Sequence, residues 1–404
     1  MFRINSDDFY MINYVRRPSF KRRGGEGGGK APVQTFTISG NCGVGLATLT
    51  PSWGLDAVTA DASGTYSVEV WRGWSGDITP SLTNYIFAAA SKTYVNVVEN
   101  YTNEDYVAAA ILTLSAVVTD GQTVTLTKVT PTGGNSIVDW GDGGATTTIT
   151  DGNTAVKTHL YATGDTYAIT LTNPALITAL ELRDAKVGCA SGQIGSLTNL
   201  TNLYLRDLAN VTVGTGEIGL LTKLTYLSFN NLANVTVGIG EIGLLTKLGY
   251  LYIQTAANVT VGTGEIGLLT GLKILYLYNS ANVTIGTGEI RLLTSLTNLY
   301  LKNLANVAVQ STDFETLIKA TWILYENSLS SPQVDAALSG LWTMFASRTG
   351  VNGTITIAFS NGAPGGTYQA ANPPTTGEEF KYELLNDSQN VNPTKKWTAV
   401  ITTA

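Results

Sequence analysis

The central part of the chain alternates apolar and polar residues in a pattern that returns every 24 residues. The first copy is Leu200-x-x-Leu203-x-Leu205. Residues two apart on a strand point to the same face, so each copy predicts one strand with two side chains turned inward. The later copies are Leu224/Leu227/Phe229, Leu248/Leu251/Ile253, Leu272/Leu275/Leu277 and Leu296/Leu299/Leu301.

Two polar columns share this period. A 24-residue unit cannot bury its own apolar face, so the units must stack into one continuous core. The asparagines of the repeated Asn-Val-Thr then lie at one level, where we expect them to hydrogen-bond turn backbone rather than to carry glycans. They are Asn210, Asn234, Asn258 and Asn282, with Asn306 in a fifth, Asn-Val-Ala copy.

The second polar column consists of glutamates from the repeated Gly-x-Gly-Glu-Ile: Glu217, Glu241, Glu265 and Glu289. Stacking places these like charges roughly 5 Å apart, which is costly unless they are solvated or paired. We interpret the column as a solvated edge, for which Glu241→Gln is nearly neutral. A row of cation ligands is the alternative.

The repeat resembles the leucine-rich repeat family. Its length, its leucine offsets and the sequence Gly-Glu-Ile followed by Leu-Leu-Thr-x-Leu are most similar to the 24-residue class with a Gly-x-Ile-Pro signature, although the proline is absent here. The resemblance implies a solenoid over residues 174–310.

The outward positions of the predicted strands are rich in tyrosine and amides and poor in charge, a composition typical of recognition surfaces. A cross-strand ladder that only stabilises the sheet is an equal alternative, and the two roles are compatible. The candidate ligand-binding face comprises Tyr204, Tyr226, Tyr250, Tyr252, Tyr276, Tyr278 and Tyr300.

Residues 33–108 predict a small β-sandwich, since segments 34–38 and 66–70 alternate between apolar and polar residues. Segments 61–68 and 73–80 resemble bacterial Ig-like modules of the prealbumin-like kind. The Trp and Tyr residues of this region suggest either a sugar-binding platform or core aromatics, and we favour the core.

Residues 109–173 predict a second sandwich. Segment 138–143, Val-Asp-Trp-Gly-Asp-Gly, together with segments 159–161 and 164–171, is similar to the PKD family of Ig-like domains. Asp139, Asp142 and His159 suggest a metal or acid–base site. We favour a structural role, with Asp-Gly forming a hairpin turn and His159 closing the sandwich beside Tyr161.

The last region, residues 311–404, predicts irregular strand–helix capping units. Ser331-Pro332 is a typical helix start and leads into a helix over 334–345. We expect a strand at 354–359, a helix at 376–385 and a strand at 397–401. The predicted fold class is therefore multidomain and mainly β: two Ig-like β-sandwiches, then a leucine-rich-repeat solenoid with α/β C-terminal capping units.

Residues 1–32 form a basic, glycine-rich arm. Seven basic and three acidic residues give it a net charge of +4, leaving −10 for the rest of a chain whose total is −6. The candidate particle anchor is Arg16, Arg17, Lys21, Arg22 and Arg23. Residues 24–30 have the spacing of a phosphate-binding loop, but Ala31 replaces the required Ser/Thr and no apolar strand precedes it, so we expect no nucleotide site.

Composition restricts the chemistry further. Only 13% of the 404 residues are charged, against roughly 25% in average soluble proteins. There is no apolar run of about 18 residues for a membrane span, and Met1 to Asp8 lacks signal-peptide features. Cys42 and Cys189 fall in different predicted domains, so we expect no disulfide framework. One histidine supports no Ser/His or Cys/His catalytic group, and we expect neither an enzyme nor a cofactor or metal.

The modular plan resembles surface proteins of tailed-phage virions, of the decoration, fibre or adhesin type. The resemblance implies a structural virion protein, made in the host cytoplasm, oligomeric in the particle and anchored to other virion proteins by its arm. The domains would serve host-surface attachment or capsid and tail decoration, with a host glycan or protein as partner; we expect neither membrane nor nucleic-acid binding. The alternatives are a bacterial cell-surface adhesin and a polysaccharide-active enzyme with accessory domains.

Overall fold

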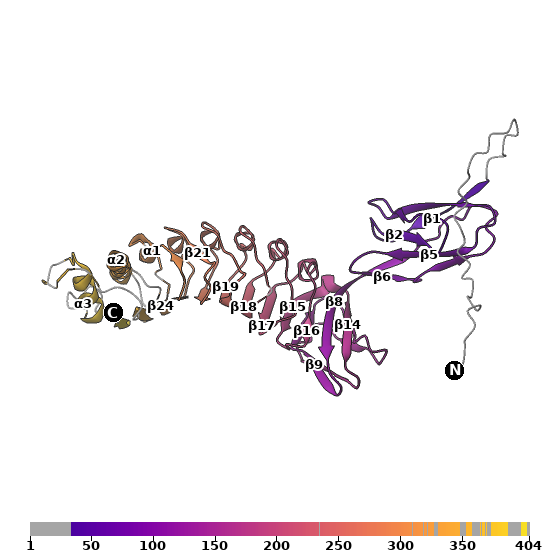
Figure 1. Cartoon of the computed structure of the whole chain (residues 1–404). Helices are drawn as coiled ribbons and strands as arrows, with labels where there is room; N and C mark the ends of the chain where they lie inside the picture. Colours follow the sequence, from indigo (N-terminus) through magenta and orange to yellow (C-terminus); the bar gives the residue numbers. More distant parts are fainter. Residues whose placement is uncertain are drawn as a thin grey trace, which may run out of the picture.

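The protein is built mainly from β-strands (Figure 1). The computed structural model describes residues 34–386, apart from positions 234, 309, 318, 321, 327–329, 348–352, 358–363, 365, 368 and 370–372, and also residues 397–401. The predicted particle anchor, Arg16, Arg17, Lys21, Arg22 and Arg23, lies outside the described residues.

The first module has a hydrophobic core of its own, which contains Ile38, Val68 and Trp74. β1 pairs with β4, and a second sheet has the order β3-β2-β5-β7. The predicted alternating segments at 34–38 and 66–70 lie largely within β1 and β4. The strands are β1 (Thr35–Asn41), β2 (Thr48–Pro51), β3 (Val58–Thr59), β4 (Thr65–Trp71), β5 (Gly76–Ser81), β6 (Tyr85–Ala88) and β7 (Lys92–Tyr94).

The second module follows without a break in strand pairing. Its first strand, β8, crosses position 108, where the sequence predicted a boundary, and β6 of the first module pairs with it. Its larger sheet has the order β12-β11-β14-β8-β16, in which β16 (Val187–Gly188) follows β15 (Ile177–Leu182) in the chain, and β13 pairs with β9. The strands are β8 (Val107–Val118), β9 (Gln122–Leu126), β10 (Lys128–Pro131), β11 (Ser136–Asp139), β12 (Thr147–Ile149), β13 (Lys157–Tyr161) and β14 (Asp165–Thr172).

The 24-residue repeats form parallel strands in register. Leu203 pairs with Leu227, Leu227 with Leu251, and Leu251 with Leu275. The predicted inward positions are buried in every copy, which confirms their assignment. The strands are β15 (Ile177–Leu182), β17 (Asn202–Arg206), β18 (Tyr226–Leu232), β19 (Tyr250–Ala256), β20 (Ile274–Tyr278) and β22 (Asn298–Lys302).

Opposite these strands, each coil makes one short 3-10 turn, as Figure 1 shows along the upper side of the stack. The turns are η2 (Ile194–Ser196), η3 (Ile218–Leu220), η4 (Ile242–Leu244), η5 (Ile266–Leu268) and η6 (Ile290–Leu292). Another 3-10 turn, η1 (Pro174–Leu176), lies directly before β15. Between strand and turn, short parallel pairings join neighbouring coils. These include β21 (Thr284–Ile285) with β23 (Asn306–Val307) and single bridges such as Val213 with Val235.

The second module covers the first edge of the stack. Its β10 pairs antiparallel with β15, and β8 pairs with β16 (Val187–Gly188). One hydrophobic core runs from Leu112 in β8 through the repeats to Leu384 near the C-terminus. The predicted units 109–173 and 174–310 therefore share a core, while residues 34–106 have their own.

The capping region continues the same sheet. β24 (Trp322–Glu326), β25 (Gly353–Ile357) and β26 (Trp397–Ile401) add three parallel strands after β22. The predicted helix start at Ser331 is confirmed, and the predicted helices 334–345 and 376–385 and the predicted strand 397–401 match within a few residues. The predicted strand 354–359 matches up to Ile357, and its last two residues lie outside the described residues. The helices are α1 (Thr312–Glu315), α2 (Ser331–Ser347) and α3 (Gly377–Asn386), and they follow the row of 3-10 turns (Figure 1).

Candidate functional site: the tyrosine face and the carboxylate column

The seven predicted tyrosines share the outward face of five consecutive strands, from β17 to β22, and all are half-buried. We call this set the tyrosine face. Five of its members form one stacked row. Ring centroids are 4.2 Å apart for Tyr204 and Tyr226, 5.3 Å for Tyr226 and Tyr252, 5.8 Å for Tyr252 and Tyr276, and 4.1 Å for Tyr276 and Tyr300.

The rings of the row lie nearly parallel, with interplanar angles between 12° and 31°. Their faces are therefore turned towards one another, and the row offers mainly ring rims and hydroxyl groups to a ligand. Tyr250 and Tyr278 flank the row, at 5.7 Å from Tyr226 and 6.3 Å from Tyr300. The cross-strand ladder expected from the sequence is thus present, and a recognition role must use the rims.

Burial raises the pKa of Tyr204, Tyr226 and Tyr252 above the usual value for tyrosine. The hydroxyls therefore keep their protons well into the alkaline range, and those of Tyr204 and Tyr252 hydrogen-bond with that of Tyr226. Beside the row, the Nδ2 amide of Asn230 donates to Oε1 of Gln254 at 3.2 Å. The polar side chains around the rings are thereby held in place as well.

The glutamate column is not a solvated edge, and that prediction was wrong. Glu217, Glu241, Glu265 and Glu289 are buried, with 5–6% of their surface exposed. Their carboxylates accept hydrogen bonds from backbone N–H groups. In Glu241, Oε1 accepts from Gly216 and Gly238, both at 2.7 Å, and Oε2 accepts from Gly219 at 3.2 Å.

The same three bonds recur in each coil. One donor is the glycine three residues before the glutamate, and two belong to the preceding coil. Glu217 accepts from Gly192, Gly195 and Gly214, and additionally from the Ser191 hydroxyl at 2.9 Å. A carboxylate accepts several bonds and donates none, so it satisfies amides that the coil backbone leaves unpaired.

Glycine makes this close approach possible. Gly216, Gly240 and Gly264 each have a φ of 93°, a region that L side chains rarely adopt. A Cβ on Gly219 would lie 3.1 Å from Cδ1 of Leu244, so the leucine of the next coil covers the bonded amide. The Gly-x-Gly-Glu-Ile signature is therefore a hydrogen-bonding unit.

The column continues in modified form at both ends. Gln193 occupies the equivalent position in the first coil, where its Oε1 accepts from Thr113 N at 2.8 Å and its Nε2 contacts Oδ1 of Asn84. Asp313 occupies it after Glu289; its Oδ2 accepts from Gln310 N at 2.7 Å, and burial raises its pKa. The residue type changes at both ends, so the repeated Gly-x-Gly-Glu-Ile pattern alone did not predict them.

The asparagine column behaves as predicted wherever it is described. The Nδ2 of Asn282 donates to the carbonyl of Ala257 in the preceding coil at 2.6 Å. Asn210, Asn258 and Asn306 make the equivalent contact to Ala185, Ala233 and Ala281. Asn234 lies outside the described residues.

The candidate Asp–His group of the second module is a local structural contact. His159 stacks on Trp140 with centroids 5.0 Å apart and lies 4.7 Å from Tyr161, which confirms the predicted neighbour. Its Nε2 is 2.7 Å from Oδ2 of Asp142, and this bond lowers the Asp142 pKa. Asp139 accepts from Gly141 N instead. Among the described residues there is no group of three or more His, Cys, Asp or Glu arranged to hold a metal ion.

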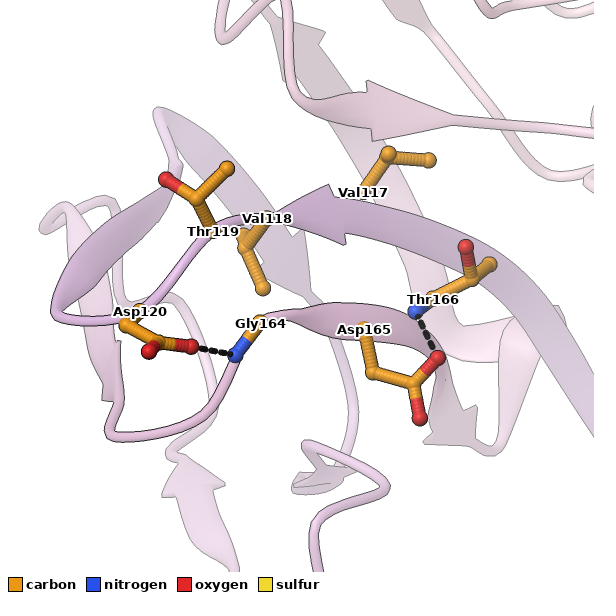
Figure 2. Close-up of a pocket in the computed structure, with 7 residues that line it drawn as sticks. All are labelled: Val117, Val118, Thr119, Asp120, Gly164, Asp165 and Thr166. Atoms are coloured by element: carbon orange, nitrogen blue, oxygen red, sulfur yellow. Dashed lines mark hydrogen bonds between the residues drawn. The ribbon is translucent and has the colours of Figure 1, made fainter.

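A shallow depression lies where β8 and β14 meet, lined by Val117 to Asp120 and Gly164 to Thr166 (Figure 2). Its two carboxylates bond nearby backbone: Asp120 accepts from Gly164 N at 2.6 Å and Asp165 from Thr166 N at 2.7 Å. Cys42 and Cys189 are free and buried, and burial raises the Cys189 pKa to about 12. No helix in the described part of the chain has the length and apolar character needed to cross a membrane.

No model of a protein family matches the chain, and no curated protein matches it. Among solved structures, the functional domain of InlJ from Listeria monocytogenes, which includes a cysteine ladder, matches at 16% sequence identity with a TM-score of 0.25. The match covers 50% of this chain and about half, 52%, of that one.

Proposed function

We propose that this protein is a non-enzymatic surface protein of a tailed-phage virion that uses its tyrosine face to attach to a host glycan or protein. On this proposal the chain combines two Ig-like modules, the second PKD-like, with a leucine-rich-repeat solenoid, and residues 1–32 anchor it to other virion proteins. The observation that carries the proposal is the half-buried row of stacked tyrosines across five parallel strands.

The row suits recognition because its side chains are already ordered. Stacked rings lose little conformational entropy when a partner binds, so most of the contact energy contributes to affinity. Protonated hydroxyls along the rims supply donors and acceptors, and the ring edges supply apolar area. Affinity at one site is expected to be weak, in the range of about micromolar to millimolar, and many copies on one particle would raise avidity.

The test is the double variant Tyr252→Ser/Tyr276→Ser, incorporated into particles. We expect normal assembly and normal copy number but reduced adsorption to host cells. Leu160→Ser in β13, an exposed position far along the chain from the face, is the matched control. Unchanged adsorption by fully assembled variant particles would rule out recognition by the tyrosine face.

The location of the protein separates the proposal from its main alternative. Antibody labelling of purified virions is expected to place the chain on the particle, and deletion of residues 1–30 is expected to abolish incorporation while the rest still folds. A bacterial cell-surface adhesin would instead be found on uninfected cells. That result would reject the virion assignment. The tyrosine variants would then be tested for adhesion of the bacterial cells instead of adsorption of particles.

A further inference from the structure

We propose that the first module carries a second binding site, a carbohydrate platform formed by the Trp53 indole. Most large aromatics of this module are core residues, as the sequence suggested: Tyr66, Trp74 and Tyr106 are almost completely buried. Trp53 is different, because 55% of its surface is exposed. Single exposed apolar side chains are common on protein surfaces, so the exposure of Trp53 matters only because the orientation of its ring is also fixed.

The Trp53 ring is held rigidly although it is exposed. Its Nε1 donates to the carbonyl of Ser75 at 2.8 Å, so the polar edge of the indole is satisfied within the protein. Its ring makes an edge contact with Trp71, with centroids 5.5 Å apart and planes at 67°. Gly54, at a φ of 78°, follows directly, and a Cβ there would lie 2.6 Å from the Trp71 ring. The loop is therefore built tightly around the two indoles.

Three loops meet at this place. Ser75, which accepts the Trp53 bond, also accepts from Asn96 N through its Oγ at 2.7 Å. Ser52 Oγ accepts from Asp77 N at 3.0 Å. Beside Asn96, Val95 is 73% exposed. The Trp53 indole is thus joined by hydrogen bonds to loops that carry the Ser52 and Ser75 hydroxyls. The Asp77 carboxylate of the same loops accepts a hydrogen bond from Thr93 Oγ1 at 2.6 Å.

This combination fits a pyranose ring better than an apolar peptide. The C–H face of a sugar packs on one indole face, and its hydroxyls meet the hydroxyls of Ser52 and Ser75 and the Asp77 carboxylate. Because the edge contact with Trp71 occupies at most one face of Trp53, the other remains available. The rigid ring also limits the entropy lost on binding. The ligand class is therefore a neutral glycan, bound independently of the tyrosine face.

The full chain is titrated separately with three tetrasaccharides, of β-linked glucose, N-acetylglucosamine and galactose, and binding is measured by isothermal titration calorimetry. We expect saturable binding of at least one, with a Kd of about a millimolar, and a loss of tenfold or more in Trp53→Ala. Trp53→Tyr retains a ring and should keep part of the affinity. The Tyr252→Ser/Tyr276→Ser variant should bind as the parent does.

Two outcomes would overturn the proposal. One is the absence of binding to any of the three sugars at about ten times the expected Kd. The other is equal binding by Trp53→Ala, with a thermal unfolding curve showing that the variant is folded. Loss of binding in the tyrosine variant alone would move the sugar to the tyrosine face, contradicting this site while supporting the proposed function.

Discussion

The same coils carry two columns of aligned side chains that the structure treats in opposite ways. The tyrosines of the strands are apolar in large part, yet they stay half-exposed and contact mainly one another. The glutamates of the turns are charged, yet they are buried and bonded to backbone amides. Burial in this stack therefore follows the needs of the backbone more closely than the polarity of the side chain.

The glutamates tolerate burial because each carboxylate meets three N–H donors. Amides directed at a carboxylate stabilise its charged form and offset both desolvation and the repulsion between neighbouring coils. The tyrosines, by contrast, lie on strands whose backbone is already paired with the neighbouring strands. The glutamate column is expected to be essential for folding, and the tyrosine column to be dispensable for it.

The largest effect is expected from a core position that serves as reference for both columns. Leu251→Ala should lower the free energy of unfolding by about 2–5 kcal/mol, because Leu251 is fully buried and packs in register with Leu227 and Leu275. Chemical denaturation measures this value. Leu160→Ala, at a position that is 61% exposed, is the control, and an equally large loss there would undermine the comparison.

The glutamate column should come next. Glu241→Gln is expected to cost about 1–3 kcal/mol, since the amide NH₂ replaces one acceptor oxygen and meets N–H groups that then lack a partner. A solvated glutamate column would instead give a nearly neutral effect on the free energy of unfolding. Glu69→Gln, at an exposed carboxylate of the first module, is the control. A neutral Glu241→Gln in thermal unfolding would show that the carboxylate is not needed as an acceptor.

The tyrosine column should matter less for stability. Tyr252→Ser removes two ring contacts, to Tyr226 and Tyr276, and aromatic pairs contribute about 0.5–1.5 kcal/mol each. We expect a total loss of roughly 1–3 kcal/mol, below that of Leu251→Ala, with the fold retained by circular dichroism. Unfolding of the single variant would mean that the face is a structural element first.

The smallest effect is expected to be stabilising. Thr255 has a φ of 49°, in a left-handed region that disfavours β-branched residues. The equivalent positions of other coils hold Asp207, Asn231, Asn279 and Asn303, which link in pairs such as Asn231 Nδ2 to Asp207 Oδ1 at 2.9 Å. Thr255→Asn should therefore raise the free energy of unfolding by about 0.5–1 kcal/mol. Thr225→Asn, at a position outside this column, is the control; a destabilised Thr255→Asn would contradict the argument.

Much of the fold could be predicted because the repeat supplies the same information several times. The inward leucines, the strand register and the helix at Ser331 follow from spacing and capping residues alone. The fusion of the second module with the stack could not be predicted. It depends on β10 pairing with β15, between residues about 50 positions apart in sequence, and no local pattern encodes that contact.

The candidate site, too, could be predicted only in part. The sequence identified all seven tyrosines of the face, since outward strand positions follow from alternation. It indicated a cross-strand ladder as one of two compatible roles, but the nearly parallel orientation of the rings depends on side-chain conformations between neighbouring coils. For the first module it offered a sugar-binding platform or core aromatics and favoured the core, and it did not single out Trp53, whose ring is held by a bond to Ser75 and a contact with Trp71.

The sequence by itself determined the 24-residue period, the parallel register and the set of side chains that face each way, because these depend on covalent spacing and on alternation along a strand. The tertiary structure alone decided that Glu217 to Glu289 are buried. The donors that make this possible come from glycines of two different coils, 3 and about 22–25 residues away. Only the stacking of coils brings those amides to one carboxylate. Their hydrogen bonds replace the water that a charged side chain would otherwise keep around it, so the carboxylate can be buried.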